Sequence, residues 1–209
     1  MTHALLVKRI ETIIDLSYNI FINKVAFEDI AIHNEASMQM HLGTIIKQIG
    51  VLHEFSPKER FIIELETPET IEATTKSIKG GARCDIKIAL QNGNKKAEAF
   101  IELKYFKKSK NEAVTDNKYA LYCDLENLEK YRDNDTKRVC YEILYTDNIN
   151  YTKDKICKYS IGEGHLVTGS YEYTKDRKVL LKNRYNMHWD IYTYGIGKEK
   201  HDCFLKIKL

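Results

Sequence analysis

The sequence predicts a single α/β domain in which two helices precede three strands, followed by a third helix and a fourth strand. Three observations support this class. In three long segments, apolar residues recur every three or four positions, which is the helical period. Four shorter runs are rich in β-branched and aromatic residues, as strands are. The 209 residues are 43% hydrophobic and include only two prolines, so we expect one packed core without a proline-rich linker.

Two helices are expected near the start of the chain. The first covers residues 4–20, where leucines and isoleucines form one helical stripe. The second covers residues 35–49, with Asn34 as its N-cap and Gly50 as its stop. Glu35 therefore falls in the first turn of the second helix, where a carboxylate interacts favourably with the helix dipole.

The remaining elements of the expected core are four strands and one helix. The strands are residues 60–66, 83–90, 97–106 and 138–145, and the helix covers residues 112–131 between the last two. On the first strand, Glu64 and Glu66 alternate with apolar residues and are expected on a solvated face, although either could still reach a nearby site as a substitute acid.

The last third of the chain gives a weaker signal. Short strand candidates (KVLLKN, HWDIYTYG and CFLKIKL) alternate with glycines, so we expect an irregular, β-rich extension over about residues 148–209. The core then spans about residues 28–147 of one domain that covers residues 1–209. Residues 150–209 hold twelve Lys and Arg against seven Asp and Glu. Tyrosines interleave with these cations, which suits either base stacking or ordinary strand packing, and packing is favoured.

Several functional classes find no support in the sequence. The five cysteines are scattered and never form a CxxC pair, which disfavours a disulfide framework or a zinc knuckle. The seven histidines show no HExxH spacing, and the glycine-containing run IKGGAR lacks the ending of an ATP-binding loop. No signal-peptide pattern and no apolar run of membrane-spanning length is present. We therefore expect an unanchored cytoplasmic protein with no membrane partner.

The charges of the hairpin RCDIKIALQNGNKKAEAFIELKYF (83–106) require an explanation. Side chains alternate along a strand, so Asp85 lies on one face and Glu102 with Lys104 on the matching face of the next strand. The other face is apolar and should lie on helices; it is formed by Cys84, Ile86, Ile88, Leu90, Ala99, Ile101, Leu103 and Tyr105.

The turn of the hairpin determines whether these charges meet. A two-residue turn at Gly93 and Asn94 pairs residues whose numbers sum to 187 and puts Asp85 opposite Glu102. A two-residue turn one position earlier makes them diagonal neighbours on the same face. A three-residue loop sends the two carboxylates to opposite faces unless a bulge restores the phase.

Two interpretations of this face remain open. Carboxylates at strand spacing repel one another but suit a hard divalent cation, and Lys104 can then stabilise charge on a phosphoryl oxygen or orient a water molecule. Alternatively, Lys87 and Lys104 neutralise Asp85 and Glu102 on a wet surface. The short pattern acidic-any-Lys occurs five times in the chain, so only its place in a hairpin distinguishes Glu102-Leu-Lys104.

The set of Asp85, Glu102-Leu-Lys104 and an upstream helical Glu35 resembles the PD-(D/E)xK nuclease superfamily, over about residues 35–147. The resemblance implies a restriction-endonuclease-like fold with a mixed central sheet flanked by helices. It also implies a Mg²⁺ ion, replaceable by Mn²⁺, that is held by Asp85 and Glu102 with Glu35 as a further ligand, while Lys104 assists the attacking water. One departure is Cys84, which stands where the family has proline.

The resemblance implies a DNA endonuclease of restriction or repair type, and a homodimer would suit cleavage of both strands. Candidate phosphate contacts are Lys95, Lys96, Lys107, Lys108 and Lys110, which lie at the hairpin end or directly after the third strand. The same lysines are equally expected in a solvated loop. The alternative function is a binding module for nucleic acid or protein that retains the nuclease fold without cutting.

Overall fold

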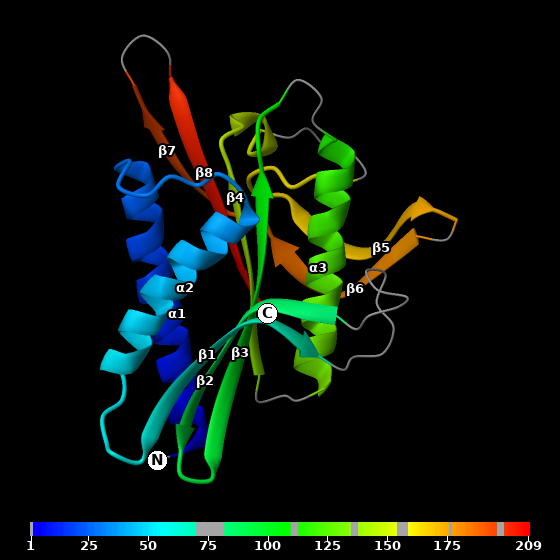
Figure 1. Cartoon of the computed structure of the whole chain (residues 1–209). Coiled ribbons are helices and arrows are strands. Elements are labelled where there is room, and N and C mark those ends of the chain that lie inside the picture. Colours follow the sequence, from blue (N-terminus) through cyan, green and yellow to red (C-terminus); the bar gives the residue numbers. More distant parts are fainter. Residues whose placement is uncertain are drawn as a thin grey trace.

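The computed structural model describes residues 2–69, 82–109, 113–134, 138–153, 159–175, 177–195 and 199–209. A mixed six-stranded sheet with the order β1-β2-β3-β4-β8-β7 forms its centre, and β5 and β6 form a separate two-stranded sheet. Helices α1 and α2 pack on one side of the central sheet and α3 on the other (Figure 1). The elements are, in chain order, α1 (His3–Ala26), α2 (Glu35–Leu52), β1 (Glu59–Glu69), β2 (Ala82–Asn92), β3 (Lys95–Phe106), α3 (Val114–Asn134), β4 (Arg138–Thr146), a short 3₁₀ helix η1 (Ile149–Tyr151), β5 (Leu166–Thr174), β6 (Arg177–Asn186), β7 (Trp189–Tyr194) and β8 (Lys200–Lys208).

These elements confirm the predicted α/β class and the predicted order of the first seven elements. Strands β3 and β4 are parallel and are joined through α3, whereas every other pair in the central sheet is antiparallel. Among the described residues, no helix combines the length and the apolar character that crossing a membrane requires.

Helix α2 begins where the sequence predicts and ends later. The Asn34 side chain accepts the Ser37 N–H, and the Ser37 side chain accepts the Asn34 N–H, which is a reciprocal N-terminal cap. The prediction that Gly50 stops this helix is wrong, because the helix continues to Leu52. A Cβ at Gly50 would lie 2.2 Å from the ring of Phe61. The glycine therefore allows α2 to lie close to β1.

The main core lies between the central sheet and helices α1 and α2. The predicted apolar face of the β2–β3 hairpin packs there, through Ile86, Ile88, Leu90, Ala99, Ile101 and Leu103. Cys84 is the exception, and its predicted place on this face is wrong. Cys84 clusters with Phe100, Tyr131 and other residues on the α3 side of the sheet. The alternation of faces is therefore shifted between Cys84 and Ile86.

Helix α3 covers the face of β3 that carries the charged residues. The ring of Phe100 stacks on Tyr131 of α3 at a centroid distance of 5.2 Å. Glu102 and Lys104 are 3% and 9% exposed. The interpretation of this face as a wet outer surface is therefore wrong. Glu102 and Lys104 lie in the interface between the sheet and α3.

Part of the C-terminal third completes the central sheet. Strand β8 pairs with β4, and β7 pairs with β8. The β5–β6 hairpin packs on α3, where the buried carboxylate of Glu129 accepts hydrogen bonds from the Asn183 N–H at 2.8 Å and the Tyr185 hydroxyl at 2.6 Å. The rings of Tyr171 and Tyr173 contact the tyrosines Tyr119, Tyr122 and Tyr159. These contacts support the packing interpretation of the tyrosine-rich region.

A buried ion pair joins α1 to the start of β1. The Arg9 guanidinium donates to both carboxylate oxygens of Glu59, at 3.0 and 2.8 Å, and Glu59 also accepts from the Phe55 N–H and the Asn92 side chain. Hydrogen bonds from Arg9, above all, lower the pKa of Glu59 from 4.5 to about 2, against the effect of burial.

This ion pair predicts an acid-sensitive contribution to stability. Because the folded-state pKa of Glu59 lies below its ordinary value, the contribution is present above pH 4.5 and is lost as the pH falls towards 2. Urea unfolding at a series of pH values is expected to show this loss in the wild type. Glu59→Gln is expected to lower stability by about 3 kcal/mol at pH 7 and to flatten the pH dependence over that window. An unchanged slope in the variant would contradict the assignment.

Candidate active site

The regular pairing of β2 with β3 ends next to the predicted site residues Asp85 and Glu102. Asn92 pairs with Lys95, so the turn is at Gly93 and Asn94, and paired residue numbers sum to 187, as the first of the three turn alternatives predicts. The regular pairing stops at Ile86 with Ile101. At the next level, Asp85 Oδ2 accepts the Leu103 N–H at 2.6 Å. A side-chain carboxylate thus takes the place of a main-chain acceptor on the neighbouring strand.

Strand β1 is irregular at the same level. Glu66 has a φ of 52°, in the left-handed region that non-glycine residues rarely adopt, and the β1–β2 ladder omits its pairing with Asp85. The side-chain amide of Gln39, on α2, donates to Glu66 Oε1 at 3.0 Å and to the Asp85 main-chain oxygen at 2.7 Å. Glu66 is exposed, as expected for the solvated face of this strand, and its carboxylate extends towards α2.

Lys104 lies at the centre of the charged cluster. Its Nζ is 2.7 Å from Asp124 Oδ2 on α3 and 3.6 Å from Glu35 Oε1 at the start of α2, and it donates to the Leu103 main-chain oxygen at 2.8 Å. Asp124 is fully buried, whereas the Glu35 side chain is 46% exposed. Lys104 therefore connects the two helices on opposite faces of the sheet, and solvent reaches Glu35 but not Asp124.

The surrounding carboxylates keep Lys104 in its charged form. Burial by itself lowers the pKa of Lys104, but the negative charges of Glu142, Glu35, Asp85 and Glu102 outweigh it and raise the pKa above the ordinary value. The ammonium is therefore protonated at neutral pH and cannot serve as a general base. It can stabilise negative charge or orient a polar molecule.

Two buried acidic residues of this cluster were not predicted. Glu142 on β4 is in register with Glu102 on the parallel strand β3, and Asp124 lies on α3. The sequence holds a signal for Glu142, since it is the one charged residue inside the otherwise apolar run VCYEILY. A charge within a strand buried on both faces indicates a polar cluster. Asp124 has no comparable signal, because acidic residues are frequent along this helix.

The predicted phosphate contacts divide into two groups. Lys107 and Lys108 are exposed directly after β3, and the Lys108 N–H donates to Asp147 Oδ1 at 2.6 Å. Lys95 and Lys96 lie at the turn, seven and six residues from Glu102 and thus about 20 to 23 Å away along β3. Lys96 pairs with Glu98 at 2.6 Å. The hairpin-end lysines therefore do not join this site. Lys110 lies outside the described residues.

The carboxylates of this cluster are suitable ligands for a hard cation, but their positions only partly match a metal site. The negative charges of Glu35, Asp85 and Glu102 all act on the ammonium of Lys104, and Mg²⁺ takes carboxylate oxygens as ligands. Within the described ranges, however, no group of three or more His, Cys, Asp or Glu side chains is arranged as a metal site.

Comparisons with other proteins add no assignment. No model of a known protein family matches the chain. No curated protein and no solved structure matches it either.

Proposed function

We propose that this chain is a Mg²⁺-dependent nuclease that hydrolyses phosphodiester bonds, acting on DNA as an endonuclease of restriction or repair type. The observation that supports it best is the convergence of Glu35, Asp85 and Glu102 on the ammonium of Lys104, at the level where the β2–β3 ladder ends. These residues come from three different elements. Buried charge of this kind costs folding free energy, so such a concentration favours a functional role.

The excess of negative charge in the cluster also supports the proposal. Five carboxylates, those of Glu35, Asp85, Glu102, Asp124 and Glu142, act on one ammonium. A divalent cation at Asp85 and Glu102 would offset part of this negative charge, with the half-exposed Glu35 as a further ligand. When bound, Mg²⁺ would lower the pKa of a ligated water and polarise a phosphate oxygen.

The side chains of this chain would carry the remaining steps. Lys104 stays protonated and would stabilise charge that develops on the scissile phosphate, while Asp124 holds its ammonium in place from α3. Lys107 and Lys108 would contact phosphates that flank the cleaved bond, independently of base sequence. Gln39 fixes the main chain of Asp85 through its amide.

A test of this proposal is a plasmid cleavage assay combined with Mn²⁺ binding. The wild type is expected to nick or linearise plasmid DNA with Mg²⁺ or Mn²⁺ and to lose this activity in EDTA. Isothermal titration is expected to show Mn²⁺ binding that Asp85→Asn removes. Asp29→Asn, which changes an exposed carboxylate in a turn, is the matched control and is expected to bind Mn²⁺ as the wild type does. Absence of both binding and cleavage would refute the proposal.

A second candidate is a binding module that keeps the nuclease-like arrangement but does not cut. The tight contact of Lys104 with Asp124 and the absence of an arranged metal site among the described residues favour it. Filter binding distinguishes the two functions. Binding to nucleic acid that weakens with salt, is indifferent to EDTA and yields no product would support this candidate.

A further inference from the structure

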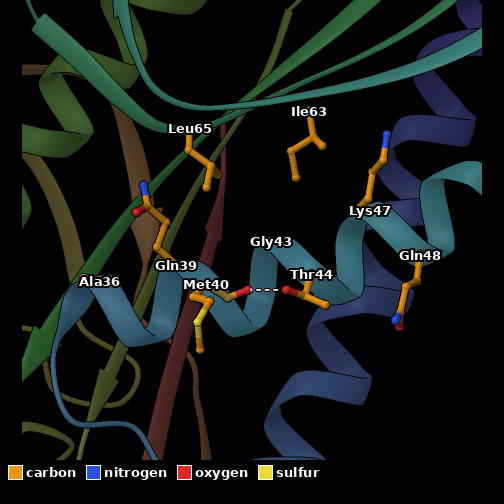
Figure 2. A pocket seen from close by; sticks show the side chains of 9 residues that line it. All are labelled: Ala36, Gln39, Met40, Gly43, Thr44, Lys47, Gln48, Ile63 and Leu65. Atoms are coloured by element: carbon orange, nitrogen blue, oxygen red, sulfur yellow. Dashed lines mark hydrogen bonds between the residues drawn. The ribbon is translucent and has the colours of Figure 1, made fainter.

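Two pockets lie beside the elements that carry the candidate active site. One is an apolar groove between α2 and β1, whose cationic side chain, Lys47, is exposed (Figure 2). The other, the α3 pocket, has a volume of about 190 Å³ and lies between the start of α3 and η1, at the same end of the sheet (Figure 1). It is lined by Val114, Lys118, Asn148, Asn150 and Tyr151. Because Lys118 is only 6% exposed, the α3 pocket holds a buried positive charge, whereas the groove has a surface lysine.

The side chains of the α3 pocket can donate hydrogen bonds. The Asn148 side-chain oxygen accepts the Asn150 N–H at 3.2 Å, and the same carboxamide carries an NH₂ donor. The Tyr151 hydroxyl accepts from the Asn117 side chain at 2.9 Å and keeps its own proton for donation. An ammonium has three donors, so Lys118 can bind a ligand oxygen in addition to groups of the chain. The pocket therefore combines one charged donor with two neutral ones.

The charge of the α3 pocket favours an anion. Of the five described residues that line it, Lys118 alone is charged. The neighbouring acidic residues bind groups elsewhere, since Asp116 accepts the Tyr173 hydroxyl and Asp147 Oδ1 accepts the Lys108 N–H at 2.6 Å. Burial of an ammonium costs free energy, which a bound anion would offset. Lysine, asparagine and tyrosine side chains are also among those that bind phosphate oxygens in nucleic-acid complexes.

Hydrogen bonds and ring packing connect the α3 pocket to the strand that carries Lys104. The Thr146 hydroxyl donates to the Phe106 main-chain oxygen at 2.6 Å and accepts the Asn148 N–H at 3.1 Å. The ring of Tyr151 packs on Phe106 at a centroid distance of 5.1 Å. Phe106 is two residues after Lys104 and thus about 7 Å further along β3. The pocket therefore lies at the end of the strand that contributes to the candidate active site.

We propose that the α3 pocket binds a phosphate group of the nucleic-acid substrate, on one side of the bond that is cleaved. Lys118 supplies the positive charge, and Asn148 and Tyr151 donate neutral hydrogen bonds to the phosphate oxygens. The assignment of this phosphate to a substrate strand rests on the proposed nuclease function. Phosphate binding itself requires neither the metal ion nor cleavage.

Fluorescence anisotropy with a labelled DNA duplex in EDTA, over a series of salt concentrations, tests the pocket without cleavage. Lys118→Met is expected to weaken binding at least about tenfold at low salt. It is also expected to reduce the slope of log affinity against log salt by about 1, because one phosphate contact is lost. Lys47→Met, which changes the exposed lysine of the groove, is the matched control and is expected to keep the wild-type affinity and slope. An unchanged slope in folded Lys118→Met would overturn the inference.

A second variant separates a phosphate contact from a loss of folding. Tyr151→Phe keeps the ring that packs on Phe106 and removes only the hydroxyl. It is expected to weaken DNA binding about fivefold without a change in the salt slope, because a neutral hydrogen bond is lost. Circular dichroism and urea unfolding check the fold of every variant. Wild-type affinity of folded Tyr151→Phe would overturn the inference, whether or not Lys118→Met folds.

Inorganic phosphate distinguishes a substrate phosphate from a free one. If isothermal titration shows phosphate binding that Lys118→Met removes, while DNA affinity and salt slope stay unchanged, the pocket serves free phosphate and the inference is wrong. The proposed nuclease function fails separately. A wild type that binds DNA with the expected dependence on Lys118 but does not cleave it with Mg²⁺ would leave the pocket as a phosphate contact of a non-cleaving module.

Discussion

Replacing Glu102 by glutamine is expected to reduce Mg²⁺-dependent cleavage of plasmid DNA by about a thousandfold, because one of the expected carboxylate ligands of the cation loses its charge. Glutamine has nearly the same shape, and Glu102 is only 3% exposed among other carboxylates. Removing one buried negative charge from this cluster is therefore expected to leave the free energy of unfolding unchanged or higher.

The measurement is the initial rate of supercoiled plasmid loss, with urea unfolding of the same samples. Glu172→Gln, an exposed glutamate on β5, is the matched control and is expected to cleave at the wild-type rate. Wild-type cleavage by Glu102→Gln would remove Glu102 from the proposed mechanism. A loss of activity that parallels a loss of stability would count against a direct role as well.

The second large effect is expected when Lys104 is replaced by methionine. This change is expected to lower the free energy of unfolding by about 3 to 5 kcal/mol. The ammonium is 2.7 Å from Asp124, which has no solvent exposure, and it also interacts with Glu142, Glu35, Asp85 and Glu102. Methionine keeps most of the volume but leaves these carboxylates without their central cation. Urea unfolding at pH 7 measures the change.

A double variant separates the ion pair from packing. Lys104→Met combined with Asp124→Leu removes both charges and fills the space, and it is expected to recover at least half of the lost stability. Asp124→Asn alone, which keeps Lys104 among its other carboxylates, is expected to cost less than Lys104→Met. Equal stability of Lys104→Met and the wild type would show that the cluster does not depend on this cation.

Much of the core follows from local patterns. The helical stripes, the alternating strands and the Asn-Gly-Asn turn depend on neighbours in the sequence, and the structure confirms the elements and the turn register. Gly50 was misread for the same reason, because a glycine near a helix end resembles a stop signal. Its role is a close approach to Phe61, which is distant in the sequence.

The site was only partly predictable. The face of Glu102 and Lys104 follows from strand alternation, whereas Glu35 was proposed only through the family resemblance, and Asp85 lies where the regular alternation ends. The participation of Asp124 depends on how α3 crosses β3, and that of Glu142 on the parallel register of β3 and β4. The displacement of Cys84 to the α3 side reflects irregular pairing at Asp85 and Glu66, which no period in the sequence reveals.

The sequence by itself determined the α/β class, the first seven elements and the face on which Glu102 and Lys104 lie, because these depend on residues a few positions apart. Only the tertiary structure decided that this face is buried under α3, that β7 and β8 complete the central sheet, and that Lys104 lies between Asp124 and Glu35. Long-range packing sets these contacts, and it brings together groups that no local pattern relates.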